Sequence, residues 1–271
     1  MPRVGNVRNC MIKRMTKKMA FSLTGKRTLI TGGTAGIGYA VAKRFVDNGA
    51  HVIISGRREE GVDIAETIGA RFLQADMMVD GDIVRLVDQA AELLGGLDVV
   101  VNNAGIAESD GGIEKSTEEA YESQMSVNLD AAFRILQLTP KHMSSGGSII
   151  NTASISGTWG EPNLAVYGAT KAALISLTKS AALDLARRNI RVNAVNPGFI
   201  YSEIWNLGPP DDLSKTFVPL GRVGEADEAA APYHFLASDD ASYVTGSCLG
   251  VDGGLSAGHS VQSMKFMRDN A

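Results

Sequence analysis

The stretch RTLITGGTAGIG, residues 27–38, joins a short aliphatic run to a glycine-rich turn that opens an amphipathic segment. Glycine lets a backbone turn sharply and approach a phosphate, and the free N–H groups at the start of a helix favour negative charge. A turn of this kind between a strand and a helix is typical of dinucleotide-binding proteins. Gly32, Gly36 and Gly38 follow the spacing G-x-x-x-G-x-G, which differs from the commonest fingerprint, G-x-G-x-x-G. A turn that binds no ligand is the alternative interpretation.

Downstream of this turn, β-branched or aliphatic runs alternate with longer amphipathic stretches, which is the pattern of parallel strands joined by crossover helices. The runs interpreted as strands are Arg27–Thr31, His51–Ser55, Arg71–Ala75, Leu97–Asn102, Ser148–Ala153, Arg191–Asn196 and Cys248–Val251. The expected helical stretches include Ile37–Asn48, Gly81–Leu94, Tyr121–His142, Leu164–Arg188 and Glu225–Ala237. Right-handed crossovers place successive helices on both faces of such a sheet. The sequence therefore predicts a single-domain, doubly wound (Rossmann-like) α/β fold with a seven-stranded parallel sheet, helices on both faces and its ligand at the carboxyl ends of the strands.

Length, charge and cysteine content narrow the class of partner. The chain has 271 residues, a formal net charge of −4 and two cysteines, Cys10 and Cys248. That length favours one sizeable domain, and no apolar run approaches the roughly 18 residues of a membrane span. The slightly acidic balance offers no general attraction to nucleic acid, and two isolated cysteines suggest neither a disulfide framework nor a metal cluster. We expect a cytoplasmic protein with a small-molecule ligand and no metal, nucleic-acid or membrane partner.

Two short segments flank the predicted dinucleotide-binding domain, residues 20–258. The leader, residues 1–19, has no acidic residue and carries six basic ones, Arg3, Arg8, Lys13, Arg14, Lys17 and Lys18. We expect it to be disordered, with a transit peptide and a basic nucleic-acid-binding arm as alternatives. The stretch from Met19 to Lys26 looks like the natural beginning of the fold. Residues 259–271 form a C-terminal tail.

Ser154, Tyr167 and Lys171 carry the residue types needed for proton transfer. Ser154 follows the fifth predicted strand, and Tyr167-x-x-x-Lys171 lies on the next predicted helix. Residues four apart share a helix face, so the Lys171 ammonium is expected to lower the pKa of the Tyr167 phenol from its ordinary value of about 10. Such a tyrosine can act as a general acid or base, and the Ser154 hydroxyl can stabilise charge developing on a substrate oxygen. A surface Tyr–Lys pair without a catalytic role is the alternative.

Three further motifs accompany this group. They are Asn102-Asn103-Ala104-Gly105 after the fourth predicted strand, Asn128 on a predicted helix, and Pro197-Gly198 after the sixth strand. Over residues 24–257 the order and spacing of all these motifs resemble those of the short-chain dehydrogenase/reductase family. The resemblance implies an NAD(P)-dependent oxidoreductase that interconverts a carbonyl and a secondary alcohol by hydride transfer, with Tyr167 as the acid/base.

The resemblance also implies roles for single residues. The catalytic residues would be Asn128, Ser154, Tyr167 and Lys171, with Asn128 holding a water in a proton relay and Lys171 also holding the nicotinamide ribose. The implied cofactor-binding residues are Gly32, Thr34, Gly36, Ile37, Gly38, Arg57, Asp76, Asn103, Ala104, Gly105, Tyr167, Lys171, Pro197, Gly198, Ile200 and Ser202. Three alternatives remain open: Asn128 as a satisfied buried asparagine, Asn103 as a purely architectural residue, and Asp76 as a helix N-cap.

Cofactor preference rests on the end of the second predicted strand. Gly56 stands where family members that prefer NAD carry an aspartate, and Arg57 stands where a basic residue pairs with the 2′-phosphate of NADP. NADP is therefore favoured. NAD is the alternative for two reasons. Many NADP-binding relatives carry a basic residue at the position of Ala35, and the acidic residues Glu59 and Glu60 lie close to Arg57 in the sequence.

The substrate is left open by the sequence. A 3-oxoacyl-thioester reductase is one alternative, beside sugar, polyol, steroid and xenobiotic reductases, and a non-catalytic dinucleotide-binding regulator is the alternative outside catalysis. Residues 203–219 lack strong periodicity and are expected to form a mobile substrate lid. Trp159 is a candidate to line the pocket, with ordinary core packing as the favoured alternative. The family resemblance implies a homotetramer that pairs the helices Tyr121–His142 and Leu164–Arg188.

Overall fold

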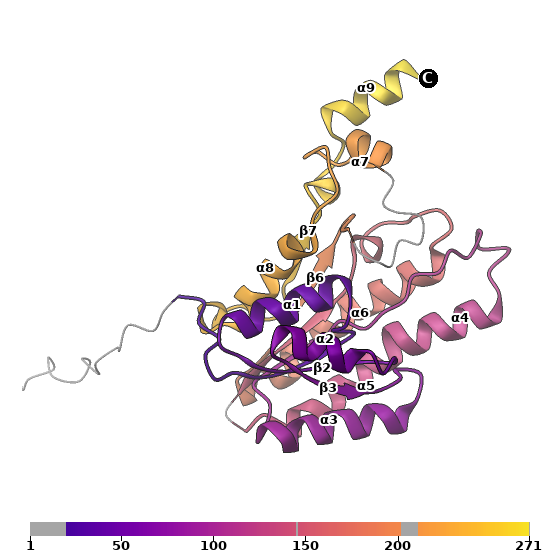
Figure 1. Ribbon diagram of the computed structural model, residues 1–271. Helices are drawn as coiled ribbons and strands as arrows, with labels where there is room; N and C mark the ends of the chain where they lie inside the picture. The colour runs from indigo at the N-terminus through magenta and orange to yellow at the C-terminus, as the bar shows by residue number, and fades with distance from the viewer. Residues whose placement is uncertain (1–19, 145, 202–210, 271) are drawn as a thin grey trace, which may run out of the picture.

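A sheet of seven parallel strands forms the centre of the computed structural model, which describes residues 20–144, 146–201 and 211–270. The strand order is β3-β2-β1-β4-β5-β6-β7 (Figure 1). The strands are β1 Arg27–Thr31, β2 His51–Gly56, β3 Arg71–Gln74, β4 Val99–Asn102, β5 Gly147–Thr152, β6 Ile190–Pro197 and β7 Cys248–Val251. The chain builds outward from β1 to β3 and then returns to place β4 on the other side of β1. This reversal leaves a crevice beyond the carboxyl ends of β1 and β4.

Helices connect the strands. The α-helices are α1 Gly36–Asp47, α2 Gly61–Ile68, α3 Asp80–Leu94, α4 Glu118–Met125, α5 Ala131–Leu138, α6 Ala165–Leu185, α7 Asp211–Phe217, α8 Ala226–Ala237 and α9 Val261–Asp269. The shorter turns are the π-helical η1 Ser126–Asp130 and the 3-10 helices η2 Thr139–His142, η3 Ile155–Gly157, η4 Ala186–Arg188, η5 Asp239–Ala241 and η6 Leu255–Ala257. Among the described residues, no helix is both long and apolar enough to cross a bilayer.

Two apolar layers cover the two faces of the sheet. Successive strand side chains point to opposite faces, so a strand buried on both sides is a continuous aliphatic run. Ile30 of β1 packs in one layer with α1, α2 and α8, whereas Leu29 packs in the other with α3, α5 and α6. Val101 and Val100 of β4 divide between the layers in the same way. The predicted doubly wound sheet with helices on both faces is therefore confirmed.

The predicted strands are all present, with small shifts at several ends; the largest is at β4, which begins at Val99 instead of Leu97. The predicted single helix Tyr121–His142 is wrong in detail, because this path begins at Glu118 and passes through α4, η1, α5 and η2. Part of the predicted lid, residues 203–219, is the helix α7, although residues 202–210 lie outside the described residues. The predicted tail contains α9, which stands with α7 away from the sheet (Figure 1).

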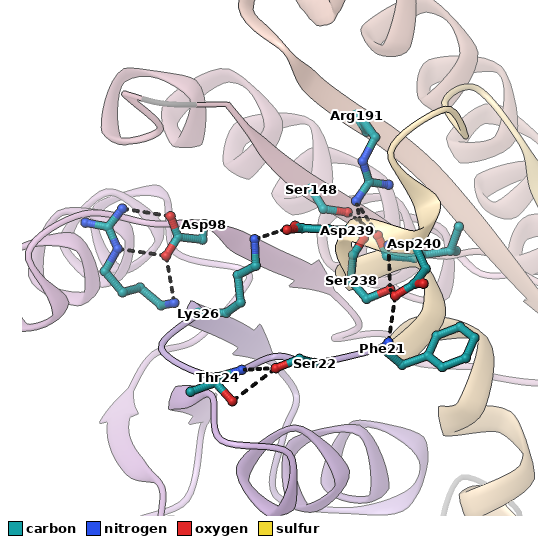
Figure 2. Close-up of polar contacts among 12 residues, drawn as sticks. Phe21, Ser22, Thr24, Lys26, Asp98, Ser148, Arg191, Ser238, Asp239 and Asp240 are labelled. Carbon is teal, nitrogen blue, oxygen red and sulfur yellow. Dashed lines mark hydrogen bonds and ion pairs between the residues drawn. The ribbon is translucent and has the colours of Figure 1, made fainter. Parts of the chain in front are cut away.

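The segment before β1 is held against the turn that follows α8 (Figure 2). The backbone N–H of Phe21 donates to the Asp240 carboxylate at 2.6 Å, and Lys26 Nζ lies 2.8 Å from Asp239 Oδ1. His234 of α8 lies with its Nε2 atom 2.5 Å from the Phe21 carbonyl oxygen, and the Leu23 side chain is fully buried. The entry to β1 is therefore anchored by both polar and apolar contacts. The predicted leader, residues 1–19, lies outside the described residues.

An ion pair between Arg27 and Asp98 joins the start of β1 to the approach to β4. The Asp98 carboxylate accepts from the Arg27 backbone N–H at 2.9 Å and from its guanidinium Nε and Nη2 atoms at 2.8 Å each. Both side chains are about one quarter exposed. Burial raises the pKa of Asp98, but the hydrogen bonds and charge of Arg27 outweigh burial and hold the pKa below its usual range.

Replacement of Asp98 by Asn tests the contribution of this pair. Because the pair is partly exposed, we expect Asp98→Asn to lower the free energy of unfolding at pH 7 by about 1–2 kcal/mol. The folded-state pKa of Asp98 is depressed, so its contribution is present above the unfolded pKa of about 3.9 and is lost as the pH falls through the folded value. Urea unfolding at several pH values should show the deficit shrinking below pH about 4. Asp47→Asn, which breaks the exposed Lys43–Asp47 pair, is the control and should change stability little at any pH; an equal deficit in both variants would contradict the expectation.

Candidate active site

A pocket of about 1070 Å³ opens where the strands end. Its walls come from the turn after β1, the loop after β4, the end of β5, the start of α6 and the end of β6. Most residues predicted to form the site line this pocket: Gly32, Thr34, Gly36, Ile37, Gly38, Arg57, Asp76, Asn103, Ala104, Gly105, Ser154, Tyr167, Lys171, Pro197, Gly198 and Ile200. Ser202 lies outside the described residues, and Asn128 does not line the pocket. Trp159 is also absent from the lining, contrary to its predicted place there, and is 38% exposed.

The glycine turn forms a cradle that side chains would fill. Gly32 has a φ of +64°, and a Cβ there would lie 2.9 Å from the Cα atom of Ala104. A Cβ on Gly38 would lie 2.2 Å from the Gly32 carbonyl oxygen. In this described segment no side chain caps the start of α1, so backbone N–H groups face the pocket end of the helix. An open helix start beside a close-packed glycine turn fits the pyrophosphate of a dinucleotide.

Asn103 binds the glycine turn to the end of β4. Its Nδ2 atom donates to the carbonyl oxygens of Thr31 and Gly32, each at 3.1 Å. The Thr31 hydroxyl oxygen in turn accepts from the backbone N–H groups of Asn103 and Ala104, each at 3.0 Å. The architectural interpretation of Asn103 therefore has direct support in these contacts, and its place in the lining leaves the predicted cofactor contact open.

Thr152 and Tyr233 extend this network and were not predicted. The Thr152 hydroxyl donates to Asn103 Oδ1 at 3.2 Å and lies 2.8 Å from the hydroxyl of Tyr233 on α8. Tyr233 is fully buried, and burial raises the pKa of its phenol strongly. In the sequence, both residues are indistinguishable from ordinary strand and helix residues. Their polar contacts join segments that are distant in the sequence, so no local pattern predicts them.

Ser154, Tyr167 and Lys171 meet at one side of the pocket. The i, i+4 spacing places Lys171 Nζ 5.5 Å from the centroid of the Tyr167 ring, and the Nζ atom donates to the Thr152 carbonyl oxygen at 2.9 Å. The Ser154 side chain interacts with the Tyr167 phenol and lowers its pKa. Ser154 precedes η3, and its hydroxyl oxygen accepts from the Ser156 backbone N–H at 3.1 Å. The arrangement presents two hydroxyl groups beside a buried cation.

The pKa of Tyr167 differs from the sequence prediction. Burial raises the pKa of the phenol, the Ser154 hydrogen bond lowers it and the charge of Glu161 raises it, so the net shift is upward. The predicted net lowering is wrong, because burial of the phenol dominates the shift. Burial lowers the pKa of Lys171 to about 8, and its Nζ atom faces the Thr152 carbonyl and the tyrosine ring. Tyr167 therefore holds its proton at neutral pH.

Asn128 lies behind the pocket in the π-helical turn η1. Its amide donates to the Ile106 carbonyl oxygen at 2.9 Å and to Thr170 Oγ1 at 3.3 Å, and its Oδ1 atom accepts from the Ile106 N–H at 2.8 Å. A Cβ placed on Gly105 would lie 3.2 Å from Asn128 Oδ1 and 3.3 Å from Lys171 Nζ, so the amide and the ammonium approach the same glycine. These contacts agree with a satisfied buried asparagine; a role in holding water stays a prediction.

The opposite end of the pocket carries Arg57 and Arg58 next to Gly56. A Cβ on Gly56 would approach Thr34 Cγ2 at 3.0 Å, so this strand end packs closely against the glycine turn. Asp76 accepts from the Met78 N–H at 2.9 Å, whereas α3 begins only at Asp80 with Val79 as its N-cap. The alternative of Asp76 as a helix N-cap is therefore wrong, because its side chain closes a turn before the helix.

Several lining residues had no recognisable signal in the sequence. Ser156 and Glu161 lie between Ser154 and Tyr167, and the Ser156 hydroxyl donates to the Glu161 carboxylate. The Ser154 hydroxyl donates to Ser156 Oγ at 3.1 Å. A hydrogen-bonded chain thus runs from Ser154 through Ser156 to a carboxylate. The one sequence feature that could have indicated their place in the pocket is that both residues fall between two predicted catalytic residues.

Comparison with known proteins gives extensive matches. Residues 32–256 match the family model described as Enoyl-(Acyl carrier protein) reductase. The chain is 40% identical to the NADP-dependent (R)-specific alcohol dehydrogenase of Lentilactobacillus kefiri, over 88% of this chain and 100% of the relative. It is 39% identical to the 3alpha-hydroxysteroid dehydrogenase of Mediterraneibacter gnavus, over 87% of this chain and 98% of the relative. It is also 39% identical to a 3-oxoacyl-(acyl-carrier-protein) reductase of Thermotoga maritima, over 86% and 98% of the two chains.

Solved structures give a consistent result. A short-chain dehydrogenase from Burkholderia cenocepacia in complex with NADP superposes with a TM-score of 0.82 at 34% identity, covering 86% of this chain and 99% of that one. A short-chain type dehydrogenase/reductase from Mycobacterium marinum gives a TM-score of 0.83 at 34% identity, covering 88% and 98%. The similarity therefore includes the sheet, the glycine turn and the segment with Tyr167.

Replacement of Gly38 by Ala tests the cradle. Because the new Cβ would lie 2.2 Å from the Gly32 carbonyl oxygen and 2.4 Å from Asn103 Nδ2, the turn must shift, and we expect the affinity for NADPH to fall at least about tenfold. Fluorescence titration with NADPH measures the change. Gly81→Ala is the matched control, since a Cβ at Gly81 meets nothing within 4 Å, and its affinity should equal that of the unmodified protein. Equal affinities in all three proteins would show that this turn does not hold the dinucleotide.

Proposed function

The chain belongs to the short-chain dehydrogenase/reductase family, and we propose that its pocket reduces a carbonyl with Tyr167 as the proton donor. The protein is an NAD(P)-dependent oxidoreductase that interconverts a carbonyl and an alcohol. One observation carries the residue roles: Ser154 and Tyr167 line the same pocket wall beside Lys171, in a pocket that also contains the glycine cradle. Asn128 supports the loop behind them.

The cofactor-binding role falls to two groups of residues. The turn from Gly32 to Gly38 and the loop from Asn103 to Gly105 would hold the phosphates and the adenosine half, and Lys171 with Pro197–Ile200 would hold the nicotinamide half, with Ser202 as the predicted hydroxyl contact. When bound, the reduced nicotinamide supplies a hydride and the oxidised form accepts one. Every other step belongs to side chains of this protein.

Tyr167 acts at the substrate oxygen. In the direction of reduction, a C–H bond forms at the carbonyl carbon while the phenol proton moves to the oxygen, which becomes the hydroxyl of the product. Burial keeps the pKa of Tyr167 raised, so the proton is in place at neutral pH. Ser154 donates a hydrogen bond to the same oxygen and stabilises the charge that develops there.

Lys171 supports the phenol after proton transfer. The pKa of its amine is about 8 because the group is buried, so the ammonium form predominates at neutral pH. A cation close to Tyr167 favours the phenolate left by proton donation, and the hydrogen bond to the Thr152 carbonyl fixes its position. The same pair can return the proton when the reaction runs toward oxidation.

NADP is the proposed cofactor, with NAD as the alternative. Arg57 and Arg58 at the pocket end provide positive charge for a 2′-phosphate, and Gly56 leaves no carboxylate for an unphosphorylated ribose. The alcohol dehydrogenase of L. kefiri is named as NADP-dependent, and the B. cenocepacia structure contains NADP. These two relatives support the preference.

Substitution of Tyr167 by Phe tests the proposed function. We expect the variant to lose at least about a hundredfold in kcat, because the proton donor is removed, while its affinity for NADPH stays close to that of the unmodified enzyme. The assay follows the absorbance of NADPH, and then of NADH, with a panel of ketones, diketones, sugars, steroids and acyl thioesters. Tyr243→Phe, at a fully exposed tyrosine, is the matched control. Full turnover by the Tyr167 variant would refute the assigned role; dinucleotide binding without any turnover by the unmodified protein would favour the non-catalytic regulator.

Domain limits, assembly and location complete the proposal. We propose a catalytic domain of residues 20–258 with a leader and a tail, a cytoplasmic location and a homotetramer. The apolar side chains Phe133 on α5 and Leu183 on α6, which are 51% and 80% exposed, support a subunit contact. Light scattering at micromolar concentration should return the mass of four chains. Leu183→Glu should lower that mass if α6 lies in a subunit contact, and a monomer in the unmodified protein would refute the tetramer.

A further inference from the structure

Glu161 places a carboxylate at the substrate side of the pocket. The residue lies between η3 and α6; Ser154 immediately precedes η3, and Tyr167 lies in the first turn of α6. The Ser156 hydroxyl donates to Glu161 Oε2, and the Ser154 hydroxyl donates to Ser156 Oγ at 3.1 Å. The carboxylate is therefore two hydrogen bonds away from the hydroxyl that is proposed to contact the substrate oxygen.

Charge is distributed unevenly along the pocket wall. The arginines Arg57 and Arg58 lie with Asp76 at the end that is assigned to the adenosine half of the dinucleotide. Lys171 lies at the centre and donates to the Thr152 carbonyl. Glu161 lies in the segment between Ser154 and Tyr167, which follows β5, whereas the arginines follow β2, three strands away in the sheet. The lining that the structure describes thus changes from positive at the cofactor end to negative at the substrate end.

No cation of the described residues neutralises the charge of Glu161. Within the described part of the chain its carboxylate is paired with the Ser156 hydroxyl and with no lysine or arginine. Its negative charge also helps to raise the pKa of the Tyr167 phenol, so its field reaches the reacting oxygen. A partly buried charge without a counter-ion attracts a cation more strongly than an exposed one does, because water screens it less.

We propose that Glu161 determines specificity by substrate charge. It favours carbonyl compounds that carry a cationic or hydrogen-bond-donating group near the reacting carbon, and it disfavours those that carry a carboxylate. This inference rests on the proposed function, because it assigns the segment between Ser154 and Tyr167 to the substrate. A purely structural Glu161, which only shapes the segment through Ser156, would affect all substrates alike.

Glu161→Gln separates these two roles. The glutamine side chain has nearly the same shape, and its carbonyl oxygen can still accept from the Ser156 hydroxyl, so the variant removes the charge and keeps the hydrogen bond. Glu122→Gln makes the same change of charge on an exposed position of α4 and is the matched control. Glu161→Asp keeps the charge and is the conservative variant.

The experiment uses three probes with one reacting methyl ketone and different para groups: para-acetylbenzylamine, para-acetylbenzamide and para-acetylbenzoate. The readout is kcat/KM for each probe with NADPH, and the amine and benzoate values are divided by the value for the neutral amide. For the unmodified enzyme we expect the amine to exceed the benzoate by at least about tenfold, which is the ratio that one partly screened charge produces. In Glu161→Gln the ratio should approach one, whereas Glu122→Gln should keep it and Glu161→Asp should keep most of it.

A binding measurement makes the result independent of turnover. Calorimetric titration of the three probes into NADPH-loaded Tyr167→Phe protein, with and without Glu161→Gln, gives the same ratios from dissociation constants. An unchanged ratio in Glu161→Gln, or an equal loss for all three probes, would overturn the inference and leave the proposed function intact. Absence of reduction of the amide by the unmodified enzyme would count against the proposed function for aryl ketones, while the binding ratios would still decide the role of Glu161.

Discussion

Thr152, at the carboxyl end of β5, ties the two halves of the site together. Its backbone carbonyl accepts from Lys171 Nζ, and its hydroxyl joins Asn103 to Tyr233. A buried polar group that loses its partner costs about 1–3 kcal/mol, so the alignment of β5 with α6 and α8 is strongly favoured over small displacements. Asn103 then fixes the carbonyl oxygens of the glycine turn. The proposed proton-transfer group and the proposed dinucleotide cradle therefore share one anchor.

The parallel sheet explains why this anchor lies where it does. All seven strands run in one direction, so their carboxyl ends gather the turn after β1, the loop after β4 and the end of β5 at one edge. Each of these segments connects to a helix on one of the two faces, and the apolar layers hold the helices in register with the strands. Residues as distant in sequence as Thr31 and Asn103 become direct partners, because β1 and β4 are neighbours. Packing of the core thereby sets the geometry of the site.

Local sequence patterns account for the parts of the fold and of the candidate site that the sequence predicted. Strands buried on both faces are continuous aliphatic runs, as Val99–Val101 are, and the i, i+4 spacing alone places Lys171 over the ring of Tyr167. The family resemblance added the pocket residues, whose sequence spacing carries no distance information across the fold. What no local pattern predicted depends on long-range contacts: the π-helical turn at Asn128, the buried phenol of Tyr233 and the carboxylate of Glu161. The upward shift of the Tyr167 pKa belongs here too, because burial is a property of the whole fold.

Burial favours the uncharged form of both titratable groups at the centre of the site, Tyr167 and Lys171. It raises the pKa of the Tyr167 phenol and lowers that of the Lys171 amine to about 8. The phenol is thus kept as an acid, and the ammonium persists at neutral pH with only a small margin. Further charges lie at the two ends of the pocket, with arginines at one end and Glu161 at the other. In the proposed arrangement, the arginines attract the phosphate-rich end of a dinucleotide and Glu161 attracts a cationic substrate, so that the two reactants meet beside Tyr167.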